Sequence, residues 1–186
     1  MREHIFVGFG FGPIQSGLFA REAYKSGNFN RIVIAEIDQK LVDAVKANSG
    51  SYYLNIASNN GISTDQINGI EMLNPAEEKD RNKLIEAISQ ATEICTSLPS
   101  VNFYDAGENS VASLIKKGLG NSPTNGTLIY TAENNNLAAE VLEQKVGSFE
   151  NVQFLNTVIG KMSQVSNNKD EIESKLSRIE KELMGS

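Results

Sequence analysis

A glycine-rich turn near the start of the chain has the residue types that hold a phosphate group. The apolar run Ile5-Phe6-Val7 is typical of a short buried strand, and Gly8-Phe9-Gly10-Phe11-Gly12-Pro13 follows it directly. We expect Gly8 to allow a tight turn and Gly10 to let the backbone approach a pyrophosphate closely. A helix from about Ile14 would then direct its free N–H groups and partial positive charge at that anion.

The spacing of these glycines departs from the dinucleotide-binding fingerprint. The pattern G-x-G-x-x-G, started at Gly8, would have its third glycine at Pro13, and Gly12 comes one residue early. Proline is tolerated in the first turn of a helix because its missing N–H would have no partner there. We expect Gly17 to supply the close contact between helix and strand. The turn alone is equally consistent with a purely structural connection.

An acidic residue after the second strand favours a dinucleotide site. The run from Arg31 to Ala35 is typical of a strand buried on both faces, and Glu36 follows it. A carboxylate there hydrogen-bonds the adenosine ribose and repels a 2′-phosphate, so we expect NAD rather than NADP. Asp38 is a second acid, better placed to cap the next helix. A solvated strand-end carboxylate is the plainer interpretation of Glu36.

Two later strand ends complete the candidate site, because ligands of open α/β sheets bind outside the carboxyl edge of the strands. We expect Ser97, Leu98 and Pro99 to line the ribose next to the nicotinamide. Glu133 and Asn134 either cap a helix or orient the nicotinamide or substrate. The residues predicted to contact the cofactor are Gly8, Phe9, Gly10, Phe11, Gly12, Pro13, Ile14, Glu36, Ser97, Leu98, Pro99, Glu133 and Asn134.

Helical and strand-like segments alternate along the chain, which predicts an α/β fold of the Rossmann type. Such a fold has a mainly parallel sheet with helices on both faces. The stretch from Tyr52 to Ala57 is strand-like, and Asn59-Asn60-Gly61 is a strong hairpin-turn signal. We therefore expect an inserted antiparallel β-hairpin, followed by a strand from Ile67 to Leu73.

The end of the chain differs in composition from the rest. We expect a dinucleotide-binding domain over 1–165 and an amphipathic helical tail over 166–186. The apolar residues of the tail recur at spacings of four, three and four: Ile172, Leu176, Ile179 and Leu183. A helix of this kind packs on its own domain, connects to a further part of the protein, or forms a homodimer through 169–183.

Composition excludes several classes of protein. The chain has 186 residues, a net charge of −6, one cysteine and one histidine. These counts argue against a disulfide framework, a multi-cysteine zinc site and a Ser/His/Asp triad. We expect Cys95 in the core and His4 on the surface. We expect no nucleic-acid partner without a basic cluster. No apolar run is long enough to span a membrane and no signal peptide is evident, so we expect a cytoplasmic protein.

Four segments resemble the NAD-binding N-terminal domain of the mannitol dehydrogenase family, and most of all its mannitol-1-phosphate 5-dehydrogenases. The resemblance covers roughly residues 4–165. Its segments are Ile5-Phe6-Val7-Gly8-Phe9-Gly10, Ala35-Glu36, Ser51-Tyr52-Tyr53-Leu54 with the hairpin and Gly69-Ile70, and Thr131-Ala132-Glu133-Asn134-Asn135. It implies an NAD-dependent polyol or polyol-phosphate dehydrogenase that transfers a hydride between a secondary alcohol and the nicotinamide.

The chain departs from this family at the residues that face the substrate. The family signature V-D-R-I-x-P corresponds to Ile159-Gly160-Lys161-Met162-Ser163-Gln164, so Gly160 replaces the aspartate that faces the polyol and Lys161 replaces the arginine. An arginine usual after the glycines is also absent at Pro13-Ile14-Gln15. The family's catalytic Lys, Asn and His lie in a helical C-terminal domain, and no K-x4-N-x2-H pattern occurs here.

Two functions therefore follow from the sequence. In the first, the chain is the cofactor-binding part of a dehydrogenase, with no catalytic residue of its own and with a helical catalytic domain or subunit supplied separately. In the second, it is a non-catalytic dinucleotide sensor or scaffold. A methyltransferase with a similar glycine turn is a weaker hypothesis, because it gives no reason for the hairpin or for Glu133-Asn134.

Overall fold

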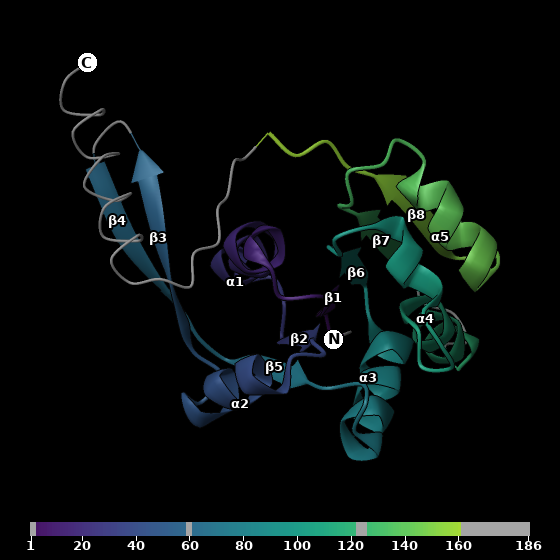
Figure 1. Cartoon of the computed structure of the whole chain (residues 1–186), viewed down its shortest axis with the longest axis horizontal. Coiled ribbons are helices and arrows are strands. Elements are labelled where there is room, and N and C mark those ends of the chain that lie inside the picture. Colours follow the sequence, from purple (N-terminus) through teal and green to yellow (C-terminus); the bar gives the residue numbers. More distant parts are fainter. Residues whose placement is uncertain (1–2, 59–60, 122–125, 161–186) are drawn as a thin grey trace.

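A six-stranded parallel sheet forms the centre of the molecule (Figure 1). The computed structural model describes residues 3–58, 61–121 and 126–160. Neighbouring strands follow the order β5-β2-β1-β6-β7-β8, and every pair is parallel. The strands are β1 (Ile5–Phe9), β2 (Arg31–Ala35), β5 (Ile70–Leu73), β6 (Glu93–Thr96), β7 (Thr127–Thr131) and β8 (Val152–Asn156). From the centre of the sheet, the order runs β1, β2, β5 toward one edge and β6, β7, β8 toward the other, which is the Rossmann arrangement. The prediction of a Rossmann-type fold is confirmed.

Helices cover both faces of this sheet. They are the π-helical segment η1 (Gln15–Phe19), α1 (Ala20–Ser26), α2 (Gln39–Ala47), α3 (Glu78–Gln90), the 3₁₀ segment η2 (Val101–Asp105), α4 (Val111–Gly120) and α5 (Ala138–Val146). Local signals set their ends: Asp38 caps α2 by accepting from Lys40 N at 3.0 Å, and Gly27 ends α1 with a φ of +65°.

Side-chain alternation along the strands divides the core into two clusters. Ile5, Val7 and Phe9 of β1 lie in one cluster together with apolar residues of α3, α4 and α5. Phe6 points to the opposite face and packs in a second cluster with residues of α1, α2 and the hairpin, among them Ala20. The period of two along a strand gives this division directly.

The predicted β-hairpin is present as a separate two-stranded antiparallel sheet, β3 (Tyr52–Ser58) with β4 (Gly61–Ile67). It projects away from the main sheet (Figure 1). The prediction of a single strand over Ile67–Leu73 is wrong, because Ile67 ends the hairpin and β5 begins only at Ile70, after Gly69 with its φ of +71°. Residues 59–60 of its turn and the predicted helical tail over 166–186 lie outside the described residues.

Candidate functional site

The tight turn begins two residues later than we expected. Gly8 lies inside β1, paired with Ile34 on one side and Cys95 on the other. Gly10 is the first residue beyond the strand, and its φ of +81° is the left-handed conformation that favours glycine. Gly8 is therefore not the turn glycine, and the regular alternation of Ile5, Val7 and Phe9 was the signal that the strand runs through it.

Gly10 sits between the ends of β2 and β6. Its N–H donates to Ala35 O at 2.9 Å, and Ser97 N donates to Phe9 O at 3.0 Å beside it. A Cβ on Gly10 would lie 2.7 Å from Ser97 O, so no other residue fits without moving the backbone. Gly12 is exposed, with nothing within 4 Å of a Cβ built on it. The turn thus leaves open space directly before the helix.

If the pattern G-x-G-x-x-G is started at Gly10, its three positions are Gly10, Gly12 and Gln15, so a glutamine replaces the third glycine. Gln15 is fully buried, and its amide lies against β1 in the space that a Cβ on Gly8 would fill. Its Nε2 and Oε1 have no hydrogen-bond partner. Gly17 does not make the close helix–strand contact that we expected, because a Cβ there would meet nothing within 4 Å. Gly8 makes that contact instead, and the helix adopts a π turn over Gln15–Phe19.

Glu36 follows β2 directly and lies immediately beside the glycine turn. Phe11 N donates to its Oε2 at 2.7 Å, while Ile37 N and Asp38 N donate to its Oε1 at 2.7 and 2.9 Å. A carboxylate has about four acceptor positions, so it can still accept from a ligand. Ile37, which sequence reasoning missed, exposes 77% of its surface next to this carboxylate. Asp38 caps α2 as expected.

Glu133 is only 6% exposed, and its carboxylate accepts hydrogen bonds from three donors. Its Oε2 accepts from Thr96 Oγ1 at 2.9 Å and from the Tyr104 hydroxyl, and its Oε1 accepts from Leu98 N at 2.8 Å. The carboxylate therefore holds the loop after β6 in place. It does not cap α5, since the N-cap residue Leu137 has no side-chain cap bond.

The other predicted contact residues divide into exposed and buried groups. Gly12, Pro99 and Asn134 are exposed, and Pro13, Ile14, Ser97 and Leu98 are partly buried. Phe9 belongs to the core, and Phe11 packs edge-on against Tyr52 of the hairpin at 5.0 Å between ring centroids. Neither aromatic ring lies open to a ligand. The backbone of the turn, rather than its phenylalanine side chains, faces the carboxyl edge.

Two buried groups near the end of β6, Cys95 and Tyr104, have raised pKa values. Burial raises the pKa of the Cys95 thiol well above its ordinary value, and Cys95 is a core residue as predicted. Burial, together with the hydrogen bond to Glu133, also raises the pKa of Tyr104. Neither group exchanges a proton readily near neutral pH. Tyr104 instead takes part in holding the loop after β6, through its hydrogen bond to Glu133.

Three solved structures share part of this fold at low identity. They are a component of the dipicolinate synthase of Bacillus halodurans (8% identity, TM-score 0.43, 84% of this chain and 39% of that one), a lactate dehydrogenase from a Medee basin deep-sea metagenome library (14%, 0.46, 78% and 43%), and a minor L-lactate dehydrogenase of Enterococcus mundtii (8%, 0.43, 80% and 43%). The chain thus spans about two fifths of the length of each.

Likeness at this level carries no argument about activity, so the fold assignment rests on the strand order itself. No protein-family model matches the chain, and no curated protein matches it. The mannitol dehydrogenase resemblance stays a prediction. Within 3–58, 61–121 and 126–160, no helix has the length and apolarity to cross a membrane, and no three His, Cys, Asp or Glu side chains are grouped to hold a metal ion.

Proposed function

We propose that the chain binds NAD(H) across the carboxyl ends of β1, β2 and β6. The observation that carries the proposal is the direct link between the glycine turn and the strand-end carboxylate, in which Phe11 N donates to Glu36 at 2.7 Å. This link brings the two recognition elements of a dinucleotide together at the centre of the sheet, where β1 and β6 are neighbours and the two strand series diverge.

The residues present fit such a cofactor. The open space at Gly12 and the helix that begins after it would accept the pyrophosphate on backbone N–H groups. Glu36 would accept hydrogen bonds from the adenosine ribose, and exposed Ile37 would contact the adenine ring. The loop that Glu133 holds, from Ser97 to Pro99, would lie beside the second ribose. Bound NAD would supply the hydride acceptor, and this chain's part is to bind and orient it.

Replacing Glu36 tests the proposal. Glu36→Gln should weaken NADH binding roughly 10- to 100-fold, because charge-assisted hydrogen bonds contribute about 1.5–3 kcal/mol. It should also reduce the preference for NADH over NADPH, since the repulsion of the 2′-phosphate is lost. Titration followed by nicotinamide fluorescence measures both affinities. Asp38→Asn is the matched control, because it removes a nearby charge, retains a capping oxygen and should leave NADH affinity unchanged.

A folded wild-type chain that shows no saturable NADH binding would overturn the proposal. Circular dichroism and a thermal melt establish that each variant is folded before its affinity is compared. Equal losses in Glu36→Gln and Asp38→Asn would also count against a specific role for Glu36, since both variants remove one negative charge at the same edge of the sheet.

We infer further that the chain is the cofactor-binding part of a polyol or polyol-phosphate dehydrogenase. The support is the motif resemblance, and the helical catalytic domain or subunit would supply Lys, Asn and His. The expected result is NADH binding without oxidation of NADH when a ketose phosphate is added. Measured turnover by this chain alone would contradict the assignment of catalysis to another part of the protein.

A non-catalytic dinucleotide-binding module is the second candidate. The observation that favours it is Gly160, an exposed residue at the position where the resembled family has the aspartate that faces the polyol. The reading frame after Ser186 separates the two candidates. A downstream helical domain with a K-x4-N-x2-H match supports the dehydrogenase, whereas a stop codon directly after Ser186 supports the module.

A further inference from the structure

One face of the main sheet is covered over only part of its width. On this face α1, α2 and the hairpin pack over β5, β2 and β1, as the second core cluster shows. The same face of β7 and β8 continues beyond that cover. Its residues there are partly exposed, among them Tyr130, Leu128 and Leu155, while Ile129 on the opposite face is fully buried.

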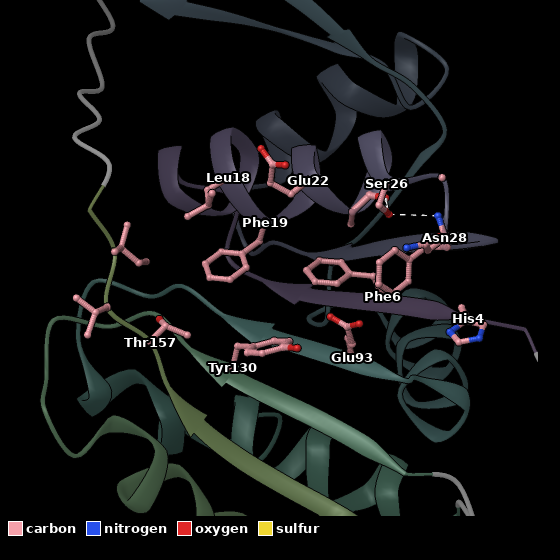
Figure 2. Close-up of a pocket in the computed structure, with 15 residues that line it drawn as sticks. His4, Phe6, Leu18, Phe19, Glu22, Ser26, Asn28, Glu93, Tyr130 and Thr157 are labelled. Atoms are coloured by element: carbon pink, nitrogen blue, oxygen red, sulfur yellow. Dashed lines mark hydrogen bonds between the residues drawn. The ribbon is translucent and has the colours of Figure 1, made fainter. Parts of the chain in front are cut away.

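A groove of about 970 Å³ marks the place where the cover stops (Figure 2). Phe19 and Ala23 line it from the helix side, and Phe6 and Tyr130 line it from the sheet. The Phe19 and Tyr130 rings stack at 6.4 Å across it, and Phe6 meets Phe29 edge-on at 5.7 Å. Aromatic side chains therefore line both the sheet side and the helix side of the groove, and the Glu93 carboxylate is a polar group on the sheet side. The groove lies on the face of the sheet, away from the glycine turn.

The residues that follow β8 lie along this groove. After β8, Thr157 is fixed to the end of β7, because both its N–H and its Oγ1 donate to Thr131 O, at 3.2 and 2.7 Å. Thr157, Val158 and Ile159 then line the groove, and Val158 is fully exposed. The described part of the chain thus ends at the rim of an apolar groove, with 26 residues still to follow, from 161 to 186.

We propose that residues 169–183 fold back as an amphipathic helix and occupy this groove. Their apolar residues, Ile172, Leu176, Ile179 and Leu183, recur at the spacing of one helix face. Twelve helical residues span about 18 Å at 1.5 Å per residue. The five residues of β7 extend about 17 Å. The segment therefore matches β7 in length, and its apolar face matches the apolar and aromatic part of the groove lining.

Connection within one chain favours this occupant over a second copy of the protein. Residues 161–171 extend up to roughly 36 Å, which is enough to place Ile172 at either end of a groove about half as long. A segment on such a short linker is present at its own groove at an effective concentration in the millimolar range. The proposal does not depend on nucleotide binding, because the groove and the glycine turn lie on different parts of the sheet.

Spin labelling of the full chain tests the proposal. A nitroxide on Ser174→Cys lies on the polar face of the segment, and Cys95 is buried and stays unlabelled. In ¹⁵N-labelled protein, we expect broadening of the amide resonances of Tyr130 and Val158 at the groove, with the amides of α3 on the opposite face unaffected. Reduction of the nitroxide should restore the resonances.

Mixing isotopes distinguishes the occupants. Broadening that disappears when spin-labelled ¹⁴N protein is mixed with unlabelled ¹⁵N protein supports docking within one chain. Broadening that persists in the mixture would overturn it in favour of a dimer, and no broadening in either sample would overturn it outright.

Paired variants test the face of the segment. Leu176→Asp should abolish the broadening, whereas Ser177→Asp, which adds the same charge at the adjacent polar position, should retain it. Equal behaviour of the two variants would contradict helical docking through the apolar face. Because both substitutions lie outside the sheet and its helices, a thermal melt should show the main fold intact in each.

Discussion

The two faces of the sheet differ in how completely they are closed. On one face α3, α4 and α5 bury β1, β6 and β7 completely, with Leu84, Ile88 and Ile129 at 0% exposure. On the other face the cover ends at α1, and Tyr130 is only partly buried. Neighbouring residues of one strand thus lie in different environments. Strand alternation gives the face of a residue but not whether that face is covered.

The largest expected difference between the two faces is in how much a Leu→Ala substitution lowers the free energy of unfolding. Leu84→Ala, on the closed face, should lower the free energy of unfolding by about 2–5 kcal/mol, because it leaves a cavity in a packed core. Leu155→Ala, on β8, should cost less than about 2 kcal/mol, because this side chain is partly exposed and lies outside the groove proposed to hold residues 169–183. Denaturant unfolding measures both. Similar costs would mean that the second face is closed as well.

A smaller effect is expected where α3 and α4 pack together. A Cβ on Gly118 would overlap the Ile88 side chain, so Gly118→Ala should destabilise the protein by about 1–3 kcal/mol. Gly120→Ala is the control within the same helix, because nothing lies within 4 Å of its Cβ. It should be neutral or slightly stabilising, since alanine favours helix over glycine. Thermal melts that rank the two variants in the opposite order would contradict tight packing on this face.

The smallest effect concerns the attachment of the hairpin on the partly covered face. Arg21 of α1 pairs with Asp65 of β4 at 2.7 Å, and this hydrogen-bonded pairing lowers the pKa of Asp65 from its ordinary value of 3.8. A carboxyl group whose pKa is lower in the folded protein than in the unfolded chain stabilises the folded state at pH values above its ordinary pKa of 3.8. That contribution is lost as the pH falls below 3.8 through the lowered pKa.

Asp65→Asn should therefore loosen the hairpin slightly at neutral pH and remove this part of its acid sensitivity. Amide chemical shifts of β3 and β4, followed from pH 6 to pH 2 in both proteins, measure it. Identical pH profiles for wild type and variant would show that the ion pair does not hold the hairpin. The effect should be small, because both side chains are only partly buried and solvent screens the pair.

The sequence was sufficient for the fold and for one side of the candidate site. Apolar runs, caps and turn signals predicted the parallel sheet, the hairpin and the place of Glu36 at the end of the second strand. These are local features, or they follow from strand order. The turn itself was placed two residues early, because the glycines at 8, 10 and 12 allow two registers and only the length of β1 selects one.

The network around Glu133 could not have been predicted from local pattern. Its partners Thr96 and Tyr104 lie 37 and 29 positions away in the sequence, and they meet the carboxylate only because β6 and β7 are neighbours. The burial of Gln15 was hidden for a related reason. A glutamine near the start of a helix is ordinarily solvated, and only the missing side chain at Gly8 makes room for it.

Because the Gln15 amide fills the space beside Gly8, substitutions at these two positions depend on each other. A Cβ added at Gly8 would overlap both the Gln15 amide and the Ile34 side chain, so Gly8 can be enlarged only if the residue at position 15 becomes smaller and Ile34 also moves. In the usual fingerprint the third glycine allows the helix to pack closely on the strand. Here the glycine at this contact is Gly8 of the strand, and the helix carries Gln15. A search that requires a glycine at the third position would therefore pass over this chain and any other that carries the same arrangement.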